Sequence, residues 1–218
     1  MFSFKKKSLS DLKVRLDLKD QIRRARILVI DDPNAFPVEL LKAEGYNVTY
    51  WEKLKSLTPL ETGDYDIIIL DLNGIATSNQ SSSDGIGILR HIKSYNPSQI
   101  VVAYSAKKYD FKQSDFWKLA DDYLGKPSPL DSCKQKIDEL LHSKFNVEHY
   151  WGILRGQLIA ESVPDKRIRK LEHLLVKKAQ QQSALSMEDF SSIVKLSKEA
   201  LSAAFVVVTI IGKLAVNA

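Results

Sequence analysis

From residue 26 to residue 143, short apolar runs alternate with segments of helical spacing. Five runs have the length and composition of buried strands, at residues 26–30, 47–51, 66–70, 100–104 and 122–124. The helical segments lie at residues 37–44, 52–62, 85–94, 114–120 and 130–143, and the second of them is interrupted near Pro59. Such alternation is typical of parallel strands covered by helices on both faces. The pattern therefore predicts a doubly wound, five-stranded α/β domain.

The last third of the chain has no strand pattern and predicts helices at residues 147–161, 166–182 and 187–216. The second and third helices would form an antiparallel hairpin. The third carries an apolar stripe at spacings of three or four: Ile193, Leu196, Ala200, Ala204, Val207, Ile211 and Leu214. The stripe could pack on the second helix, or be buried partly in a homodimer or against a partner helix, which we favour.

Charge divides the chain further. Residues 1–26 carry nine Lys/Arg against three Asp, residues 27–142 twelve basic against seventeen acidic, and residues 143–218 eleven against seven. An acidic middle between basic ends predicts a basic arm at 1–25, the α/β domain at 26–143 and a helical interaction module at 144–218. Within the arm, apolar residues alternate with polar ones, yet a helix ending at Arg24 also fits, so the arm stays unassigned.

The composition predicts a cytoplasmic protein. Cys133 is the single cysteine, which excludes a disulfide within the chain and fits a reducing compartment. No apolar region of a signal peptide follows the first lysines, and the most apolar stretch, residues 200–212, is short for a membrane span. No zinc cluster, phosphate loop or nucleophile elbow is present, so an independent enzyme is not expected.

Polar residues stand where four of the predicted strands end. Asp31-Asp32 follows the first strand and Asp71 the third, whereas Ser105 and Lys126 come at the ends of the fourth and fifth. The carboxyl ends of parallel strands share one edge of a sheet, where sites form. Three carboxylates, a hydroxyl and an amine would meet there, a set that suits Mg²⁺-dependent phosphorylation of an aspartate.

These residues, in this order, strongly resemble the receiver domain of two-component response regulators, over residues 26–142. Asp31-Asp32 matches the family's acidic pair, Asp71 its phosphate-accepting aspartate and Tyr123 its switch aromatic. Ser105-Ala106 matches the family's Ser/Thr-Ala dipeptide, and Lys126-Pro127 matches its Lys-Pro dipeptide. The resemblance implies a flavodoxin-like fold. The loop from Leu72 to Ser83 is longer than usual in the family, and Pro33 directly follows the acidic pair.

The resemblance also implies roles for these residues. Asp32, Asp71 and the backbone carbonyl of Asn73 would bind Mg²⁺ directly, with Asp31 acting through water. Lys126 and Ser105 would contact phosphoryl oxygens. Movement of Ser105 towards the phosphoryl group would let Tyr123 rotate and pass on the signal.

The expected function is that of a response regulator in a phosphorelay. Asp71 would accept a phosphoryl group from a histidine kinase or phosphotransfer protein, and the oligomeric state or partner docking would change. Two alternatives stay open: a DNA-binding transcriptional regulator that uses the basic helices, and a pseudo-receiver scaffold that carries no phosphate. The basic clusters behind the first alternative, which could also touch anionic lipid, are Lys5-Lys6-Lys7, Arg23-Arg24-Arg26, Lys166-Arg167-Arg169-Lys170 and Lys177-Lys178.

Overall fold

The chain forms two compact units in the computed structural model, which describes residues 8–9, 17–33, 36–72, 85–106 and 118–216. One unit comprises residues 17–142, and the other comprises residues 1–16 together with 143–218. The division into an arm, a receiver and a helical module at residues 25 and 143 stays a prediction.

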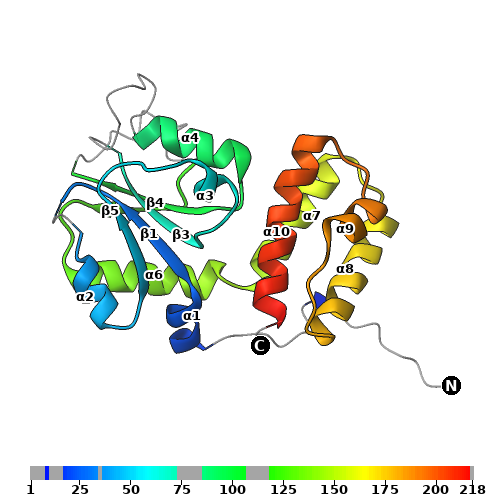
Figure 1. Ribbon diagram of the computed structural model, residues 1–218, viewed down its shortest axis with the longest axis horizontal. Helices are drawn as coiled ribbons and strands as arrows, with labels where there is room; N and C mark the ends of the chain where they lie inside the picture. The colour runs from blue at the N-terminus through cyan, green and yellow to red at the C-terminus, as the bar shows by residue number, and fades with distance from the viewer. Residues whose placement is uncertain (1–7, 10–16, 34–35, 73–84, 107–117, 217–218) are drawn as a thin grey trace. The chain divides into compact units, whose positions relative to one another are not determined.

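A five-stranded parallel sheet lies at the centre of the first unit, in the order β2-β1-β3-β4-β5 (Figure 1). This is the flavodoxin-like order of doubly wound folds, so the predicted fold class is confirmed. The strands are β1 (Arg26–Ile30), β2 (Asn47–Trp51), β3 (Ile67–Asp71), β4 (Ile100–Ser105) and β5 (Asp122–Gly125). Every residue of β3 and β4 is buried, as expected for central strands covered on both faces.

Helices cover both faces of the sheet (Figure 1). They are α1 (Leu18–Arg24), α2 (Val38–Ala43), α3 (Thr58–Glu61), α4 (Gly85–Tyr95) and α6 (Leu130–Lys144). On one face, Ile88, Leu89 and Ile92 of α4 pack with alternate residues of the strands in one hydrophobic cluster. The arm has a helix at α1, where the buried Gln21 side chain donates to the carbonyl of Leu141 at 3.0 Å.

The helices predicted at residues 52–62 and 114–120 differ from the structure where it describes them. The helix predicted over residues 52–62 was too long, because α3 has only four residues, with Pro59 in its first turn. Pro has no N–H to donate, so it is tolerated in a first turn and disfavoured further inside a helix. Of the helix predicted over 114–120, residues 118–120 form a turn and bend, and the rest lies outside the described residues.

The second unit contains α7 (Val147–Ala160), α8 (Asp165–Gln180), α9 (Met187–Ile193) and α10 (Lys198–Val216). The prediction of one helix over residues 187–216 was wrong. Val194 has an extended backbone (φ −112°, ψ 133°), and a new helix begins after Ser197, whose hydroxyl accepts the N–H of Ala200 at 3.2 Å. None of the described helices is both long and apolar enough to cross a membrane.

Most of the apolar stripe of the predicted third helix is buried within the chain, and Leu196 and Ala200 are partly exposed. Ala204, Val207, Ile211 and Leu214 are buried, and α10 packs against both α7 and α8. The sequence had suggested that much of this stripe would be left uncovered by two helices. Because α7 packs against α10 in addition to α8, the stripe gives no support for the predicted homodimer.

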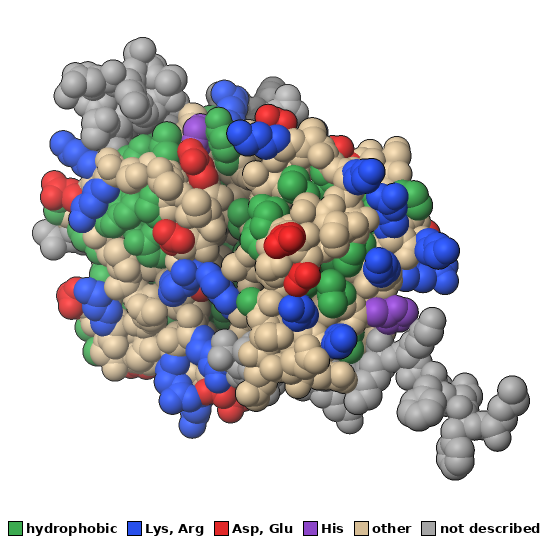
Figure 2. Space-filling view, turned by 45° about the vertical axis from the view of Figure 1, so that its right-hand side comes forward, with side chains coloured by type: hydrophobic (Ala, Val, Ile, Leu, Met, Phe, Trp, Pro, Cys, Tyr) green, Lys and Arg blue, Asp and Glu red, His purple; other side chains and the backbone are tan. Residues whose placement is uncertain are grey.

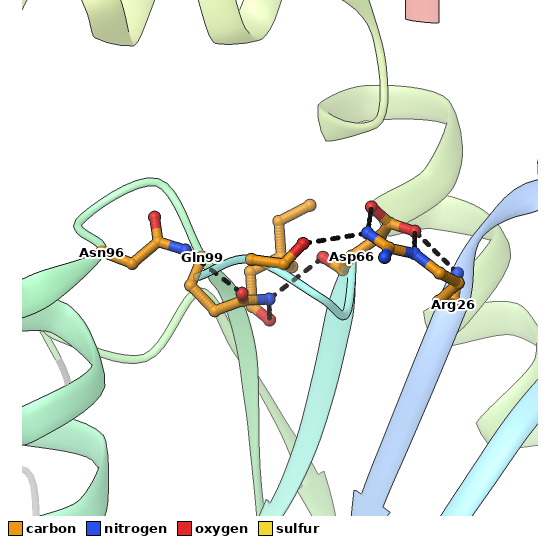
Figure 3. A network of polar contacts seen from close by, with 6 residues as sticks. Arg26, Asp66, Asn96 and Gln99 are labelled. Carbon is orange, nitrogen blue, oxygen red and sulfur yellow. Dashed lines mark hydrogen bonds and ion pairs between the residues drawn. The ribbon is translucent and has the colours of Figure 1, made fainter. Parts of the chain in front are cut away.

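A polar network stabilises the amino edge of the sheet, opposite the predicted site (Figure 3). The buried carboxylate of Asp66 accepts the backbone N–H of Arg26 at 2.7 Å and its Nη2 at 3.1 Å. Gln99 Nε2 donates to the Asp66 carbonyl at 3.3 Å, and Gln99 Oε1 accepts a hydrogen bond from Asn96 Nδ2 at 3.4 Å. Asp66, directly before β3, is therefore linked to β1 by its carboxylate and to the segment before β4 by its backbone carbonyl.

Replacing Asp66 with alanine is expected to lower the free energy of unfolding by about 3 kcal/mol, because the Arg26 side chain and N–H lose their acceptor. Urea denaturation followed by circular dichroism measures this loss. Asp64→Ala, an exposed carboxylate two residues earlier, is the matched control and should change stability little. Equal stability of the two variants would show that the network contributes nothing.

Candidate functional site

Four parallel strands deliver polar residues to the carboxyl edge of the sheet. Asp31 follows β1, Asp71 ends β3, Ser105 ends β4 and Lys126 follows β5. β1 pairs with β3, β3 with β4, and β4 with β5. The strand order therefore puts these residues on neighbouring strand ends.

Lys126 lies among three carboxylates. Its Nζ donates to Oδ1 of Asp31 at 2.6 Å, to Oδ2 of Asp71 at 2.8 Å and to Oδ2 of Asp32 at 3.1 Å. Carboxylate oxygens of the three aspartates lie within 4.8 Å of one another. With all groups ionised, one positive charge faces three negative charges, and the excess of two matches the charge of a divalent cation.

The backbone N–H and carbonyl of Asp31 are both hydrogen-bonded, whereas one of its carboxylate oxygens has no partner among the described residues. Its N–H donates to the carbonyl of Trp51 at 3.1 Å, and its own carbonyl accepts the hydroxyl of Tyr50 at 2.7 Å. The residue is fully buried, and its Oδ2 has no hydrogen-bond partner in the part of the chain described. A buried carboxylate oxygen without a partner is costly. A cation bound here would remove that cost.

Burial and the neighbouring charges alter the proton affinities in this cluster. Burial raises the pKa of Asp31, although hydrogen bonding to Lys126 acts in the opposite direction. For Lys126, burial acts to lower the pKa, but its hydrogen bonds to the three carboxylates prevail and raise it overall. Because protons compete with a cation for Asp31, we expect cation affinity to fall as the pH is lowered.

The donor set fits Mg²⁺. This ion takes carboxylate and carbonyl oxygens together with water molecules, and Asp31, Asp32 and Asp71 offer several carboxylate oxygens. Asp32 is exposed, whereas Asp31 and Asp71 are buried, so the cluster reaches from the interior to the surface. The predicted ligand Asn73 lies outside the described residues.

The side chain of Tyr123 is hydrogen-bonded to the backbone of Ser105. Ser105 is fully buried, and its carbonyl accepts the N–H of Lys126 at 2.9 Å and the hydroxyl of Tyr123 at 2.7 Å. The Tyr123 ring is half-buried against the hydrophobic cluster beside α4. The predicted switch residue thus contacts the residue predicted to sense the phosphoryl group.

Gly85 is a site residue that the sequence analysis missed. A Cβ atom at this position would lie 2.2 Å from the carbonyl oxygen of Asp71 and 2.5 Å from the Cα of Leu72. The first residue of α4 therefore packs directly on the backbone of the predicted phosphoacceptor. The Asp84-Gly85 step in the sequence was the available signal, since glycine permits close backbone approach.

The chain has similar solved structures but no matching family model or curated sequence. No protein-family model matches the chain, and no curated protein matches its sequence. Several solved structures are similar over about half of the chain. The response regulator TrrA from Thermotoga maritima, in complex with Mg²⁺-BeF, is 25% identical; the match covers 53% of this chain and 98% of that chain, with a TM-score of 0.43.

Two further structures match in the same way. A CheY-like receiver domain protein from Methanospirillum hungatei is 21% identical, with 55% of this chain and 95% of that chain covered and a TM-score of 0.45. The receiver domain of a sensor histidine kinase from Pseudomonas aeruginosa, with a magnesium ion coordinated in its active-site cleft, is also 21% identical. Its match covers 55% of this chain and 98% of that chain, with a TM-score of 0.43.

The strand order and the polar residues at the carboxyl edge are observed in this chain itself. In both features, the unit of residues 17–142 resembles the receiver domain of response regulators, and it is joined to a C-terminal part made of helices.

Proposed function

We propose that this protein is a response regulator of a phosphorelay, in which Asp71 accepts a phosphoryl group from a histidine kinase or a phosphotransfer protein. The observation that carries the proposal is the cluster of Asp31, Asp32 and Asp71 around Lys126, with one buried carboxylate oxygen that has no partner among the described residues. This cluster has the charge and the ligand atoms for Mg²⁺ at the edge where α/β sheets bind their ligands.

The proposed reaction is a transfer of one phosphoryl group. A carboxylate oxygen of Asp71 forms a bond to phosphorus as the bond between phosphorus and the donor's leaving group breaks. Asp31, Asp32 and Asp71 would hold Mg²⁺, which would supply positive charge to screen the carboxylate from the incoming phosphoryl oxygens. Lys126 provides a second positive charge 2.8 Å from Asp71 and is positioned to pair with a phosphoryl oxygen.

The proposed output begins at the Ser105 backbone. Its carbonyl holds both the Tyr123 hydroxyl and the Lys126 N–H, so a rearrangement of Ser105 towards a phosphoryl group disturbs both hydrogen bonds. Tyr123 is half-buried and contacts the cluster beside α4, and its rotation would change that surface. A changed surface would then alter partner docking or self-association.

Incubation with acetyl phosphate and Mg²⁺ is expected to add one phosphoryl group to the protein, measured by intact mass. The adduct should be absent in Asp71→Asn and after removal of Mg²⁺ with EDTA. Asp122→Asn is the matched control. This aspartate does not belong to the cluster of Asp31, Asp32 and Asp71, and it accepts a hydrogen bond from Lys136 at 2.9 Å. This variant should keep the adduct. An adduct that persists in Asp71→Asn would overturn the assignment of the acceptor.

The alternative of a pseudo-receiver scaffold is tested in the same samples. If the wild-type protein takes no phosphoryl group, binds no beryllofluoride and shows no stabilisation by Mg²⁺, the scaffold is favoured. A homodimer through the C-terminal helices stays a prediction, and light-scattering mass with and without the adduct tests it.

A further inference from the structure

The two units of the chain carry opposite net charge. Residues 17–142 contain sixteen Lys/Arg and nineteen Asp/Glu, a net charge of −3. Residues 1–16 and 143–218 contain sixteen Lys/Arg and eight Asp/Glu, a net charge of +8. The positive charge of the protein is therefore concentrated in the helical unit.

A residue near the start of the sequence contacts α8. Leu9 is 1% exposed, and its N–H donates to Oε1 of Glu172 on α8 at 3.2 Å. This hydrogen bond engages one of the two acidic side chains of α8.

Helix α8 has one apolar and one basic face. Its apolar face is buried in the helical unit and consists of Ile168, Leu171, Leu175, Val176 and Ala179. Its exposed face is basic and includes Lys166, Arg167, Arg169, Lys170, His173 and Lys177. No apolar residue of α8 belongs to the exposed class. Figure 2 shows Lys and Arg side chains gathered with a histidine on the right-hand side of the molecule.

Only one cation of this face pairs with an acid of the same helix among the described residues. Asp165 forms an ion pair with Arg169, and Glu172 accepts the N–H of Leu9. Among the described residues, no acidic side chain pairs with Lys166, Lys170 or Lys177. These lysines, with His173 between them, recur at three- and four-residue spacing and form a row about 16 Å long.

We infer that the exposed face of α8 binds the sugar-phosphate backbone of a nucleic acid. A straight row of cations about 16 Å long spans several phosphates of one strand, since DNA carries a charge about every 3.4 Å along each strand. Lysine and arginine are the usual donors to phosphate oxygens. A lipid surface fits less well, because a membrane-surface helix inserts its apolar face, and that face of α8 is buried in the unit.

The test uses the whole chain of 218 residues and a short fluorescent DNA duplex, with anisotropy measured between about 50 and 200 mM salt. Binding is expected to weaken linearly on a plot of log affinity against log salt concentration. The triple variant Lys166→Gln, Lys170→Gln, Lys177→Gln should bind roughly tenfold or more weakly, and its salt slope should be smaller by about three. Glutamine matches lysine in helix propensity, so α8 is preserved.

The matched control removes three exposed lysines from the other unit: Lys42→Gln, Lys53→Gln and Lys55→Gln. This control should keep the wild-type affinity and slope, although its net charge equals that of the α8 variant. Equal losses in both triple variants would mean that net charge alone drives binding. That result would overturn the inference. So would a wild type that does not bind the duplex, or one that binds only to vesicles containing phosphatidylserine. Phosphorylation of Asp71 should be unchanged in both triple variants, because none of the six substituted lysines belongs to the cluster of carboxylates around Lys126.

Discussion

Lys126→Gln is expected to make the stability of the protein strongly dependent on a divalent cation. In the wild type, the ammonium group of Lys126 neutralises part of the charge of three carboxylates, two of which are buried. Removing one partner from such a cluster leaves uncompensated buried charge, which costs about 3 kcal/mol. Protonation of Asp31 will recover part of this loss, because burial already raises the pKa of that carboxyl group.

Addition of Mg²⁺ should reverse most of the loss. A ligand at about 100 times its Kd adds about 2.7 kcal/mol to the free energy of unfolding. The wild type should respond less, since Lys126 already occupies the carboxylates and competes with the cation. Denaturant unfolding of both proteins with and without Mg²⁺ measures the difference. The expectation fails if the variant and the wild type have equal stability and respond equally to Mg²⁺.

Lys134→Gln is the matched control for this experiment. Lys134 pairs with Glu44 at 2.6 Å on the surface of the same unit, and neither residue belongs to the carboxylate cluster. Exposed ion pairs contribute little to stability, and this pair lies away from the proposed Mg²⁺ site. The control should therefore unfold like the wild type and show the same response to Mg²⁺.

The sheet and the site could be predicted because their signals are local and regular. Buried parallel strands have continuous apolar runs, and β3 and β4 show this pattern in full. Once the strands are parallel, their carboxyl ends must share one edge. Asp31, Asp71 and Lys126 could therefore be placed together without knowledge of any contact.

The helical unit was predicted less well because its boundaries depend on details that periodicity does not report. The apolar spacing continues from Ile193 to Leu214, and it suggested a single helix. The hydroxyl of Ser197 accepts an N–H from the next turn and begins a new helix, while Val194 is extended. A serine inside an apolar pattern is a weak signal, since Ser also occurs within helices.

Long-range contacts left no signal at all in the sequence. Leu9 and Glu172 are separated by 163 residues, and their hydrogen bond links Leu9 to the helical unit. The link from Tyr50 to the Asp31 carbonyl is likewise set by the pairing of β1 and β2. Such contacts follow from the folded chain as a whole, so reading the sequence could not supply them.

Gly85→Ala is expected to destabilise the protein and to disturb the site at Asp71. The added Cβ atom would lie 2.2 Å from the Asp71 carbonyl oxygen and 2.5 Å from the Leu72 Cα, and both are backbone atoms. Either α4 or the end of β3 must move, and overpacking of this kind costs about 1–3 kcal/mol. Because Asp71 is the proposed acceptor and Mg²⁺ ligand, Mg²⁺ affinity should fall together with stability.

The same substitution at Gly152 is expected to change the free energy of unfolding in the opposite direction. Gly152 lies inside α7 on an exposed face, and a Cβ atom there would meet no atom within 4 Å. Alanine favours a helix interior over glycine by about 0.5–1 kcal/mol, so Gly152→Ala should stabilise the protein and leave Mg²⁺ affinity unchanged. Urea denaturation and Mg²⁺ titration of the two variants give the comparison. If Gly85→Ala is as stable as Gly152→Ala, the first residue of α4 does not pack on the backbone of Asp71. If Gly85→Ala is destabilised but binds Mg²⁺ like the wild type, that contact supports the fold without positioning the carboxylate.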